Sequence, residues 1–536
     1  MNRHLRYTLL LGLGLSMGLS ACQDLDITPS DRPTDATFWT QATDASNVLN
    51  SCYAGLYPSD YFFFNETLSD NAFNKSDVDG SNARNIAEGA YGTNQARITN
   101  EWGYHYGGIR ACNRLLNNIN KIASLDAGLK ARYIAEAQAI RAFHYFQLMT
   151  WYGDVPLITT EASVTEANTV PRAARADVLA FVLSELDAAA AVLPVNTAYS
   201  ADDKGRFTKG AALALKARAL LYEGRWADVS AITTQLIGGQ AGAYSLFPSY
   251  AGVFSPANEN NSEDVLDLQY VFPLRTYSVQ RFFIPRTEGK LVCSIAPTQE
   301  LVNDYVMANG KTINEAGSGY NEATPYVGRD PRFAATIVYD GYVWKRPDGS
   351  SITIRTFPGT GDNSVDRADA SPTGYYSSKY FDPTADANLN SGLNLMLIRY
   401  ADVLLMHAEA LNEQGKLTAA DWNTTIAALR RRAGFTDAAA LNFPGGDQAS
   451  LRTIIRRERR TELAMEGLRI FDIRRWRTAQ VVLNGYAHGI KIGDPAVDNG
   501  YIRVDQRTFD PAKHYLWPVP QRERDINANL AQNPGW

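Results

Sequence analysis

Outside the stretch from Leu9 to Leu19, the chain lacks any apolar run approaching the roughly 18 residues that suggest a membrane-spanning helix. Positive charge is not in excess either, because 52 lysines and arginines stand against 57 aspartates and glutamates. No strongly basic region stands out beyond local patches on helices. We therefore expect a chain that does not cross a bilayer after its N-terminus and does not bind nucleic acid.

Familiar catalytic signatures are also missing. The sequence has no HExxH, GxSxG or P-loop motif and no Cys/His spacing typical of zinc. Five histidines stand alone: His105, His144, His407, His488 and His514. We expect His144 and His407, on helix flanks, to be hydrogen-bonded structural groups. The sequence thus predicts no metal, cofactor or catalytic residue, although two carboxylates could still converge in the fold as a glycosidase pair.

The N-terminus has the organisation of an export signal. Basic residues precede the apolar run Leu9–Leu19, which is followed by Ser, Ala and Cys22. This order is typical of a signal peptide, and the LSAC sequence matches the bacterial lipobox. We predict a signal peptide at residues 1–21, a lipidated Cys22 and a flexible tether at residues 22–33. The alternative is a simple secretory signal with an incidental cysteine.

Cysteine is scarce, with four in the chain. If Cys22 is lipidated, then Cys52, Cys112 and Cys293 remain, and an odd number excludes a full disulfide framework. Cys52 and Cys112 lie in apolar, helix-like surroundings, so we expect them to be buried free thiols.

What the sequence does contain is helical periodicity. Apolar residues recur at spacings of three and four along Leu397–Glu413, with charged residues opposite, and Gly415 follows as a helix terminator. A second helix is predicted over residues 419–432. The segments Gly210–Tyr222 and Trp226–Ile237 form a similar hairpin. Two such hairpins favour a tetratricopeptide-like repeat scaffold, with an unrelated α-bundle as the alternative.

Two regions interrupt this helical pattern. Residues 61–94 are polar with scattered aromatics, which predicts long loops. Residues 239–394 are rich in Gly, Pro, Asn and aromatics, with short strand-like runs; so long a block inside a helical chain tends to carry function. We therefore predict a mainly α protein with its scaffold at residues 34–238 and 395–536, a loop-rich insertion between them, and irregular chain after Trp476.

Glutamate and arginine crowd the segment that follows the second hairpin. Glu458 and Glu462 have the i,i+4 spacing of a metal or acid–base pair. Leu451, Ile454 and Met465 share the helix face of Glu458, however, and no histidine accompanies the pair. We therefore expect Glu458 to be buried against an arginine and to fix helix packing.

Besides the LSAC box, four segments carry a family resemblance: RAFHYFQLMTWYGDVPL (Arg141–Leu157), IRYADVLLMHAEALNE (Ile398–Glu413), RRERRTELAMEGLRIFDIRRW (Arg456–Trp476) and YLWPVPQRERDINANLAQNPGW (Tyr515–Trp536). Together, in this order and across nearly the whole chain, they resemble the SusD/RagB family of outer-membrane nutrient-binding lipoproteins of Bacteroidetes.

The resemblance implies a tetratricopeptide-like scaffold with loops over one face. It also implies a surface-exposed lipoprotein that caps a SusC-like TonB-dependent transporter and binds an oligosaccharide, or less often a peptide or other nutrient, without turnover. Asp24 and Asp26 are similar to the family's surface-export signal, although their spacing is looser. The competing functions are a lipid-anchored, glycan-degrading hydrolase and a purely structural lipoprotein.

Loop residues are the candidates for sugar binding, because aromatic rings stack on sugar faces while Asn, Asp and Arg bind hydroxyl groups. The candidates come from the two irregular regions, between which the resemblance places the ligand: Asp70, Asn71, Phe73, Tyr91, Tyr277, Arg281, Tyr342 and Trp344. Core packing is the alternative for each aromatic, and Trp102, Trp151 and Trp476 are expected to be structural. If Trp344 stacks on a sugar, Trp344→Ala should weaken binding by about 1–3 kcal/mol and leave folding intact.

Overall fold

The computed structural model describes residues 38–75, 83–289 and 291–536. The predicted signal peptide, Cys22, the tether and the export-signal residues Asp24 and Asp26 lie outside the described residues.

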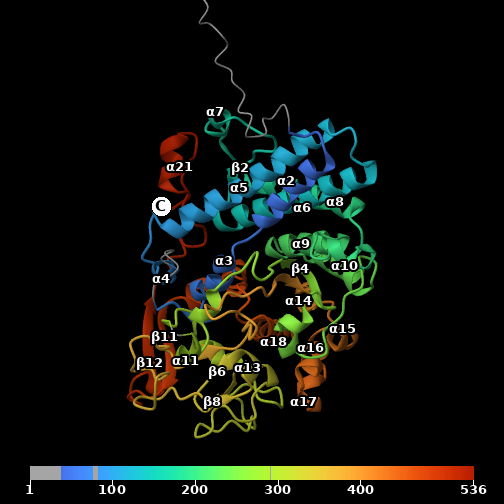
Figure 1. Ribbon diagram of the computed structural model, residues 1–536. Coiled ribbons are helices and arrows are strands. Elements are labelled where there is room, and N and C mark those ends of the chain that lie inside the picture. Colours follow the sequence, from blue (N-terminus) through green and yellow to red (C-terminus); the bar gives the residue numbers. More distant parts are fainter. Residues whose placement is uncertain (1–37, 76–82, 290) are drawn as a thin grey trace, which may run out of the picture.

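Long helices packed side by side make up one side of the molecule (Figure 1). In the N-terminal part, α2 (Ala42–Ala54) packs on α5 (Ala96–Asn118) and α6 (Ala127–Tyr152), and α8 (Arg175–Val192) lies along α6. Short helices and loops then carry the chain into the next helical pair.

The array continues through the two hairpins expected from the sequence. Helix α9 (Lys209–Tyr222) packs on α8, and α10 (Trp226–Ile237) packs on α9. Far along the chain, α14 (Tyr400–Glu413) packs on α10, and α18 (Gln448–Glu462) packs on α14. Because each helix contacts the next one in the stack, the predicted mainly α, tetratricopeptide-like scaffold is confirmed.

Local chemistry sets where these helices begin and end. The side chains of Asp126, Thr208 and Asp447 accept hydrogen bonds from backbone N–H groups in the first turns of α6, α9 and α18. Gly153 follows α6 with a φ of 75°, and Gly415 follows α14 with a φ of 66°. Glycine adopts this left-handed conformation without steric cost, so Gly415 terminates the helix as predicted.

The hairpin predicted from Leu397 to residue 432 differs from the structure in two places. Leu397 lies in β10 (Leu395–Arg399), which pairs antiparallel with β4 (Asp264–Leu268) and is buried on both faces. A short apolar run fits a buried strand as well as a helix, and here the partner strand decides. The predicted helix at residues 419–432 breaks at Thr425 into α15 (Ala419–Thr424) and α16 (Ile426–Ala433).

The charged side of α14 is also not a solvent face. Asp402 is buried against Arg218 and Arg459, and Glu409 is buried against Arg475. Both faces of this helix are therefore inside the protein, one packed by apolar contacts and the other by ion pairs.

Region 61–94 is more ordered than predicted in its described part. It contains most of α3 (Ser59–Phe64), the 3₁₀ turn η1 (Asn65–Leu68), β1 (Ala72–Phe73) and α4 (Ala83–Ala87). The polar side chains that suggested loops are instead buried and hydrogen-bonded, as at η1. Strand β1 pairs with β5 (Ala296–Pro297), so the two irregular regions lie side by side.

Region 239–394 is built from short elements. Its helices are α11 (Arg286–Gly289), α12 (Gln299–Asp304) and α13 (Pro331–Thr336), and its hairpin joins β7 (Val343–Lys345) to β8 (Ser351–Thr353). Since β4 of this region pairs with β10 of the scaffold, the division at residue 394 stays a prediction.

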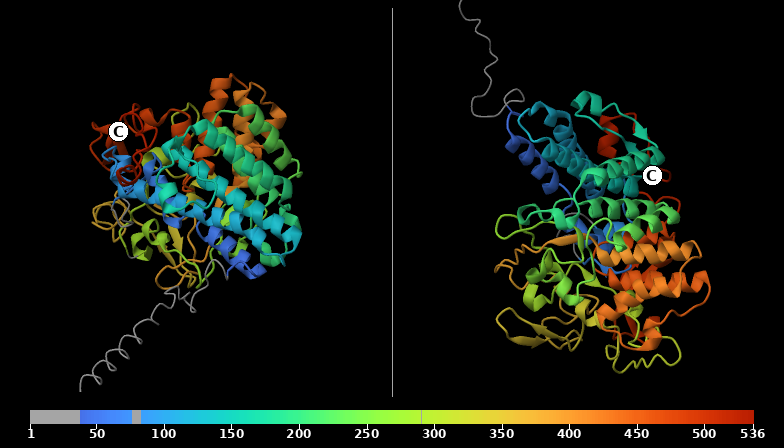
Figure 2. Two further views of the ribbon diagram at one scale, coloured as in Figure 1. Left: turned by 90° about the horizontal axis from the view of Figure 1, so that it is seen from above. Right: turned by 90° about the vertical axis from the view of Figure 1, so that its right-hand side faces the viewer.

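The chain after Trp476 was predicted to be irregular, but it forms an antiparallel hairpin of β11 (Gly485–Lys491) and β12 (Tyr501–Arg507). The final segment, including α21 (Gln521–Ile526), then lies beside N-terminal segments in both views of Figure 2. The backbone N–H of Gln521 donates to the carbonyl of Thr93, and Arg172 donates to the carbonyl of Ala531 at 2.8 Å. Among the described helices, none has the length and apolarity needed to cross a membrane.

Candidate functional site

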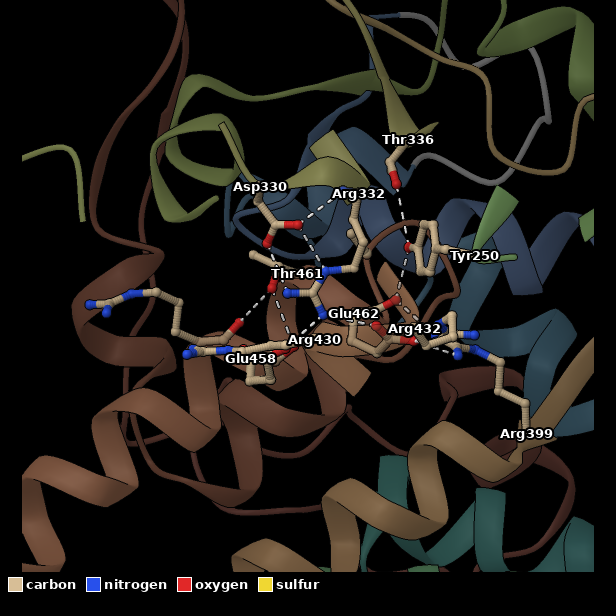
Figure 3. Close-up of polar contacts among 12 residues, drawn as sticks. Tyr250, Asp330, Arg332, Thr336, Arg399, Arg430, Arg432, Glu458, Thr461 and Glu462 are labelled. Carbon is tan, nitrogen blue, oxygen red and sulfur yellow. Dashed lines mark hydrogen bonds and ion pairs between the residues drawn. The ribbon is translucent and has the colours of Figure 1, made fainter. Parts of the chain in front are cut away.

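The glutamates of α18 lie in a buried network of ion pairs (Figure 3). Glu458 is 2% exposed, and its carboxylate oxygens lie 2.7 Å from Arg332 Nη1 and 2.8 Å from Arg430 Nε. Glu462, also buried, contacts Arg332, Arg399 and Arg432. The prediction of a buried, arginine-paired Glu458 is confirmed.

The network is balanced in charge. Its cations are Arg332, Lys379, Arg399, Arg430 and Arg432, and its carboxylates are Glu263, Asp330, Glu458, Glu462 and Glu466. Burial opposes ionisation of Glu462, but Arg432, Arg399 and Arg332 outweigh burial and hold the pKa of Glu462 well below its usual range. Residues of the irregular region, β10, α16 and α18 meet here, so the network fixes how the insertion sits on the scaffold.

Asp70 and Asn71 are buried partners of arginines from α18 and α19 (Arg469–Arg475). The carboxylate of Asp70 accepts hydrogen bonds from Arg469 at 2.8 and 2.9 Å and lies 2.9 Å from Arg460 Nη2. Burial alone would raise the pKa of Asp70, but Arg460 and Arg469 lower it well below its usual range. Asn71 donates to Glu66 and accepts from Arg460 Nε. The structure thus places both side chains in the interior, where protein groups occupy their hydrogen-bonding atoms.

Three of the aromatic candidates are buried as well. Phe73 lies in β1 beneath the guanidinium of Arg84, and Tyr277 packs against Tyr270 with ring centroids 4.8 Å apart. Trp344 is 2% exposed. No face of these three rings is open to a sugar. The Trp344→Ala prediction assumed that Trp344 stacks on a sugar, and its burial speaks against that assumption. Of the tryptophans expected to be structural, Trp102 and Trp151 are buried, and Trp476 packs on Arg456 and donates to Glu409.

The remaining candidates are partly exposed and lie apart. Tyr91 packs against His514 and Trp536 of the C-terminal segment, which also contact each other. Tyr342 packs edge-on against Tyr339 in the irregular region. Arg281 lines a surface cleft of the irregular region.

This 281–389 cleft has a volume of about 520 Å³ and lies between residues 281–289 with Leu291 on one side and the loop 381–389 on the other, and Pro347 also lines it. Phe381 and Leu291 give it apolar surface, while Arg281, Glu288, Asp386 and Asn388 give it hydrogen-bonding groups. Trp344 packs behind Phe381 with ring centroids 4.8 Å apart. Trp344 therefore supports the aromatic wall of the cleft from the inside.

Internal hydrogen bonds hold the cleft in shape. The buried side chain of Gln280 accepts from the backbone of Asp382 at 2.9 Å and donates to the carbonyl of Leu389 at 3.2 Å, so it ties both ends of the loop to the opposite wall. Arg281 Nη2 donates to the carbonyl of Asn388 at 2.6 Å. Asp386 accepts from the backbone N–H groups of Asn388 and Asn390, which fixes the loop tip as an Asx turn. A wall fixed in advance loses little entropy on binding.

Sequence reasoning missed Phe381, Asp386 and Asn388. The signal that could have found them is the run FDPTADANLN, where Asp and Asn are spaced to make side-chain turns around one aromatic residue.

The histidines do not all stand alone, as the sequence suggested. His105 Nδ1 and His144 Nδ1 lie 3.0 Å apart in the interior, and His407 Nδ1 lies 2.8 Å from Thr233 Oγ1, so His144 and His407 are the hydrogen-bonded groups that were predicted. Burial lowers the pKa of His144 well below its usual value.

Within the described residues, Cys52, Cys112 and Cys293 are buried free thiols, as predicted for the first two. In the same part of the chain, no three His, Cys, Asp or Glu side chains are placed to share a metal ion.

His488 of β11 bridges two carboxylates from opposite sides of its ring. Its Nδ1 lies 2.6 Å from Glu300 of α12, and its Nε2 lies 3.1 Å from Asp498. Because both ring nitrogens face acceptors, the protonated ring is favoured, and the hydrogen bond to Glu300 above all raises the pKa of His488. The ring thereby links the β11–β12 hairpin to α12, and we call this pair of contacts the His488 clasp.

We predict that this clasp weakens as pH rises. A histidine whose pKa is raised by folding contributes stability that is fully present below its unfolded pKa of about 6.5 and is lost as pH rises through the folded pKa. His488→Gln should therefore lose free energy of unfolding relative to the parent protein at pH 6 but little at pH 9, as measured by urea unfolding at each pH. A deficit that is the same at both pH values would contradict the charged clasp, and an NMR titration of the ring checks the direction of the pKa shift.

Comparison with known proteins bears on what this arrangement does. A family model described as "SusD family" matches residues 253–536, and one described as "Starch-binding associating with outer membrane" matches residues 25–221. SusD-like protein P2 of Formosa agariphila is 24% identical over 543 residues, which cover 97% of this chain and 98% of the relative.

Solved structures share the fold. A SusD-like carbohydrate binding protein from Bacteroides fragilis is 30% identical with a TM-score of 0.83, covering 92% of this chain and 100% of the other. A laminarin binding SusD-like protein is 25% identical with a TM-score of 0.69, covering 93% of this chain and 100% of the other.

Proposed function

Since the chain belongs to the SusD family, we propose that it is a non-catalytic, glycan-binding lipoprotein of the outer membrane that holds an oligosaccharide in the 281–389 cleft. In this proposal Cys22 carries the lipid anchor at the cell surface, and a SusC-like TonB-dependent transporter receives the ligand. The description of the matching N-terminal family model, which names association with the outer membrane, supports this location.

The composition of the cleft is the observation that carries the proposal. Phe381 offers an aromatic ring backed by buried Trp344, beside the guanidinium of Arg281 and the amide of Asn388. Apolar surface with a few convergent polar groups is what sugar rings require, because they present C–H faces and a rim of hydroxyl groups. Two relatives with the same fold are named for binding carbohydrate and laminarin, which supports a glycan as the ligand class.

The carboxylates of the cleft favour binding over hydrolysis. Both oxygens of Glu288 accept from Arg346, at 2.8 and 3.0 Å. Asp386 is engaged in its Asx turn, and Asp382 is buried and accepts from Ser391. A glycosidase needs one carboxylic acid and one free carboxylate directed at the same bond. With all three committed to structural hydrogen bonds, we propose that the protein does not turn over its ligand.

Phe381→Ala should weaken glycan binding by about 1–3 kcal/mol, because it removes the stacking surface at the cleft. The mature protein is first screened against a polysaccharide panel that includes laminarin and starch by affinity gel electrophoresis, and the retarding glycan is then titrated calorimetrically. Phe357→Ala is the matched control, since Phe357 is also partly exposed but does not line the cleft.

Two results would overturn the proposal. Equal affinity in the Phe381→Ala and Phe357→Ala variants would remove the cleft as the site. Release of shorter sugars during incubation with the panel would establish the hydrolase instead.

A further inference from the structure

A second, basic cavity of about 370 Å³ lies where α8, the turn between α9 and α10, α19 (Arg469–Arg475) and the C-terminal segment meet. We call it the arginine pocket. Its charged lining consists of Arg175, Arg474, Arg475, Arg477 and Glu223, with Tyr515 forming part of the wall. None of these residues lines the 281–389 cleft.

Two of the four arginines are neutralised by carboxylates. Arg475 donates to both oxygens of Glu409 at 2.7 Å and to Asp472 at 2.9 Å, so each of its three guanidinium nitrogens already has a carboxylate acceptor. Arg175 pairs with Glu223 and donates to the carbonyl of Met149. These two side chains frame the pocket and have little capacity left for a ligand.

The other two arginines have no such partner. Arg474 is buried, with 9% of its surface exposed, and its Nη2 donates to the carbonyl of His514 at 2.7 Å. Its Nη1 is buried without a hydrogen-bond partner. Across the described residues, no carboxylate lies within ion-pair distance of Arg474 or Arg477. The guanidinium carbon of Arg474 lies 4.9 Å from the centroid of the Trp151 ring, so its positive charge faces an aromatic ring and not a carboxylate.

Arg477 is held at the pocket by its backbone and by a ring. It is exposed and has a φ of 57°, a left-handed conformation that non-glycine residues seldom adopt. Its N–H donates to the carbonyl of Arg474 at 3.1 Å, and its guanidinium carbon lies 4.2 Å from the centroid of the Tyr515 ring. Stacking orients the planar guanidinium and leaves its edge free to donate.

The two guanidinium groups also repel each other. Burial first, and the charge of Arg477 in addition, lower the pKa of Arg474 to about 10. An anion bound by Arg477 would offset this repulsion.

We propose that the arginine pocket binds an oxyanion group of a small ligand, a carboxylate, sulfate or phosphate, with Arg477 as the donor, the unpaired charge of Arg474 in the same lining as a second source of attraction, and Tyr515 as the stacking wall. Arginine pairs with planar or tetrahedral oxyanions through parallel N–H···O hydrogen bonds, which suits the exposed guanidinium of Arg477. This site is separate from the proposed glycan cleft and does not depend on it.

The test titrates the mature protein calorimetrically with glucuronate, sulfate and inorganic phosphate in low-salt buffer at pH 7, with glucose as the uncharged comparison. We expect saturable binding of at least one anion and none of glucose, and the anion that binds most tightly identifies the chemistry. Arg477→Asn should weaken this binding at least tenfold, because asparagine tolerates the left-handed backbone but lacks the charge. Phe381→Ala should leave it unchanged.

Arg522→Asn is the matched control, because Arg522 is an exposed arginine of α21 that does not line the pocket. We expect it to change anion affinity by less than about twofold, since an exposed charge outside the site acts only through screened solvent. Absence of saturable binding for all three anions would overturn the proposal. So would equal losses in the Arg477→Asn and Arg522→Asn variants, which would indicate non-specific attraction to net charge.

Discussion

Glu458→Ala is expected to lower the free energy of unfolding by about 3–5 kcal/mol, because it leaves buried positive charge without its partner. Glu458 accepts one hydrogen bond from Arg430 and forms an ion pair with Arg332, and both arginines are nearly or fully buried. Arg332 keeps Asp330 and Glu462, but Arg430 has no second carboxylate among the described residues. The charge of Arg430 would then be held in the interior by a carbonyl alone.

Urea unfolding followed by circular dichroism measures this loss. Glu315→Ala is the control, since Glu315 is exposed and its removal should change stability by less than about 0.5 kcal/mol. Glu458→Gln keeps the shape but not the charge, so it should fall between the two. If Glu458→Ala is as stable as the Glu315→Ala control, the network does not hold the insertion on the scaffold.

Arg399→Ala should destabilise the protein by a similar amount, about 3–5 kcal/mol at pH 7, with the opposite uncompensated charge. Arg399 is 1% exposed and pairs with Glu263, Glu462 and Glu466. Removing it leaves three buried carboxylates with fewer cations. Arg431→Ala provides the control, because Arg431 is an exposed arginine of the neighbouring helix α16.

The pH dependence of the Arg399→Ala deficit distinguishes lost charge from lost packing. Burial opposes ionisation of Glu466, but Arg399 and Lys379 hold its pKa below its usual value, as the arginines do for Glu462. Carboxylates of this kind contribute stability that is present above their unfolded pKa of about 4.3 and is lost as pH falls through the folded pKa. In the variant these pKa values rise, so the deficit should shrink between pH 7 and pH 4.5. A deficit that is constant over this range would assign the loss to packing alone.

Much of the scaffold could be predicted because its signals are local. The hairpin at Gly210–Ile237 has apolar periodicity on both helices and a turn between them, and the structure has α9 and α10 in these places. Glu458 was also predictable, since a helical wheel places it among apolar neighbours. Leu397 was not, because a four-residue apolar run has no period of its own and takes its structure from the partner strand β4.

The candidate site was harder to predict, because composition does not tell a loop residue that faces solvent from one that faces the core. Asp70 and Trp344 have the chemistry of sugar-binding residues, yet one pairs with Arg469 and the other packs behind Phe381. Arg281 was correctly singled out for a cavity wall, but its neighbours in the cleft lie about a hundred residues further along the chain. No local pattern connects them.

By itself, then, the sequence determined the helical scaffold, the family resemblance, the free thiols and the burial of Glu458, since periodicity and motif order are properties of the chain alone. Only the tertiary structure decided which charged and aromatic side chains face inward. It turned the crowded charges of α18 into a balanced internal network, and it brought Arg281 to the loop at Phe381–Leu389 and Tyr515 to Arg474 and Arg477. The physical reason is that burial and ion pairing depend on contacts between distant segments, and these exist only once the chain has folded.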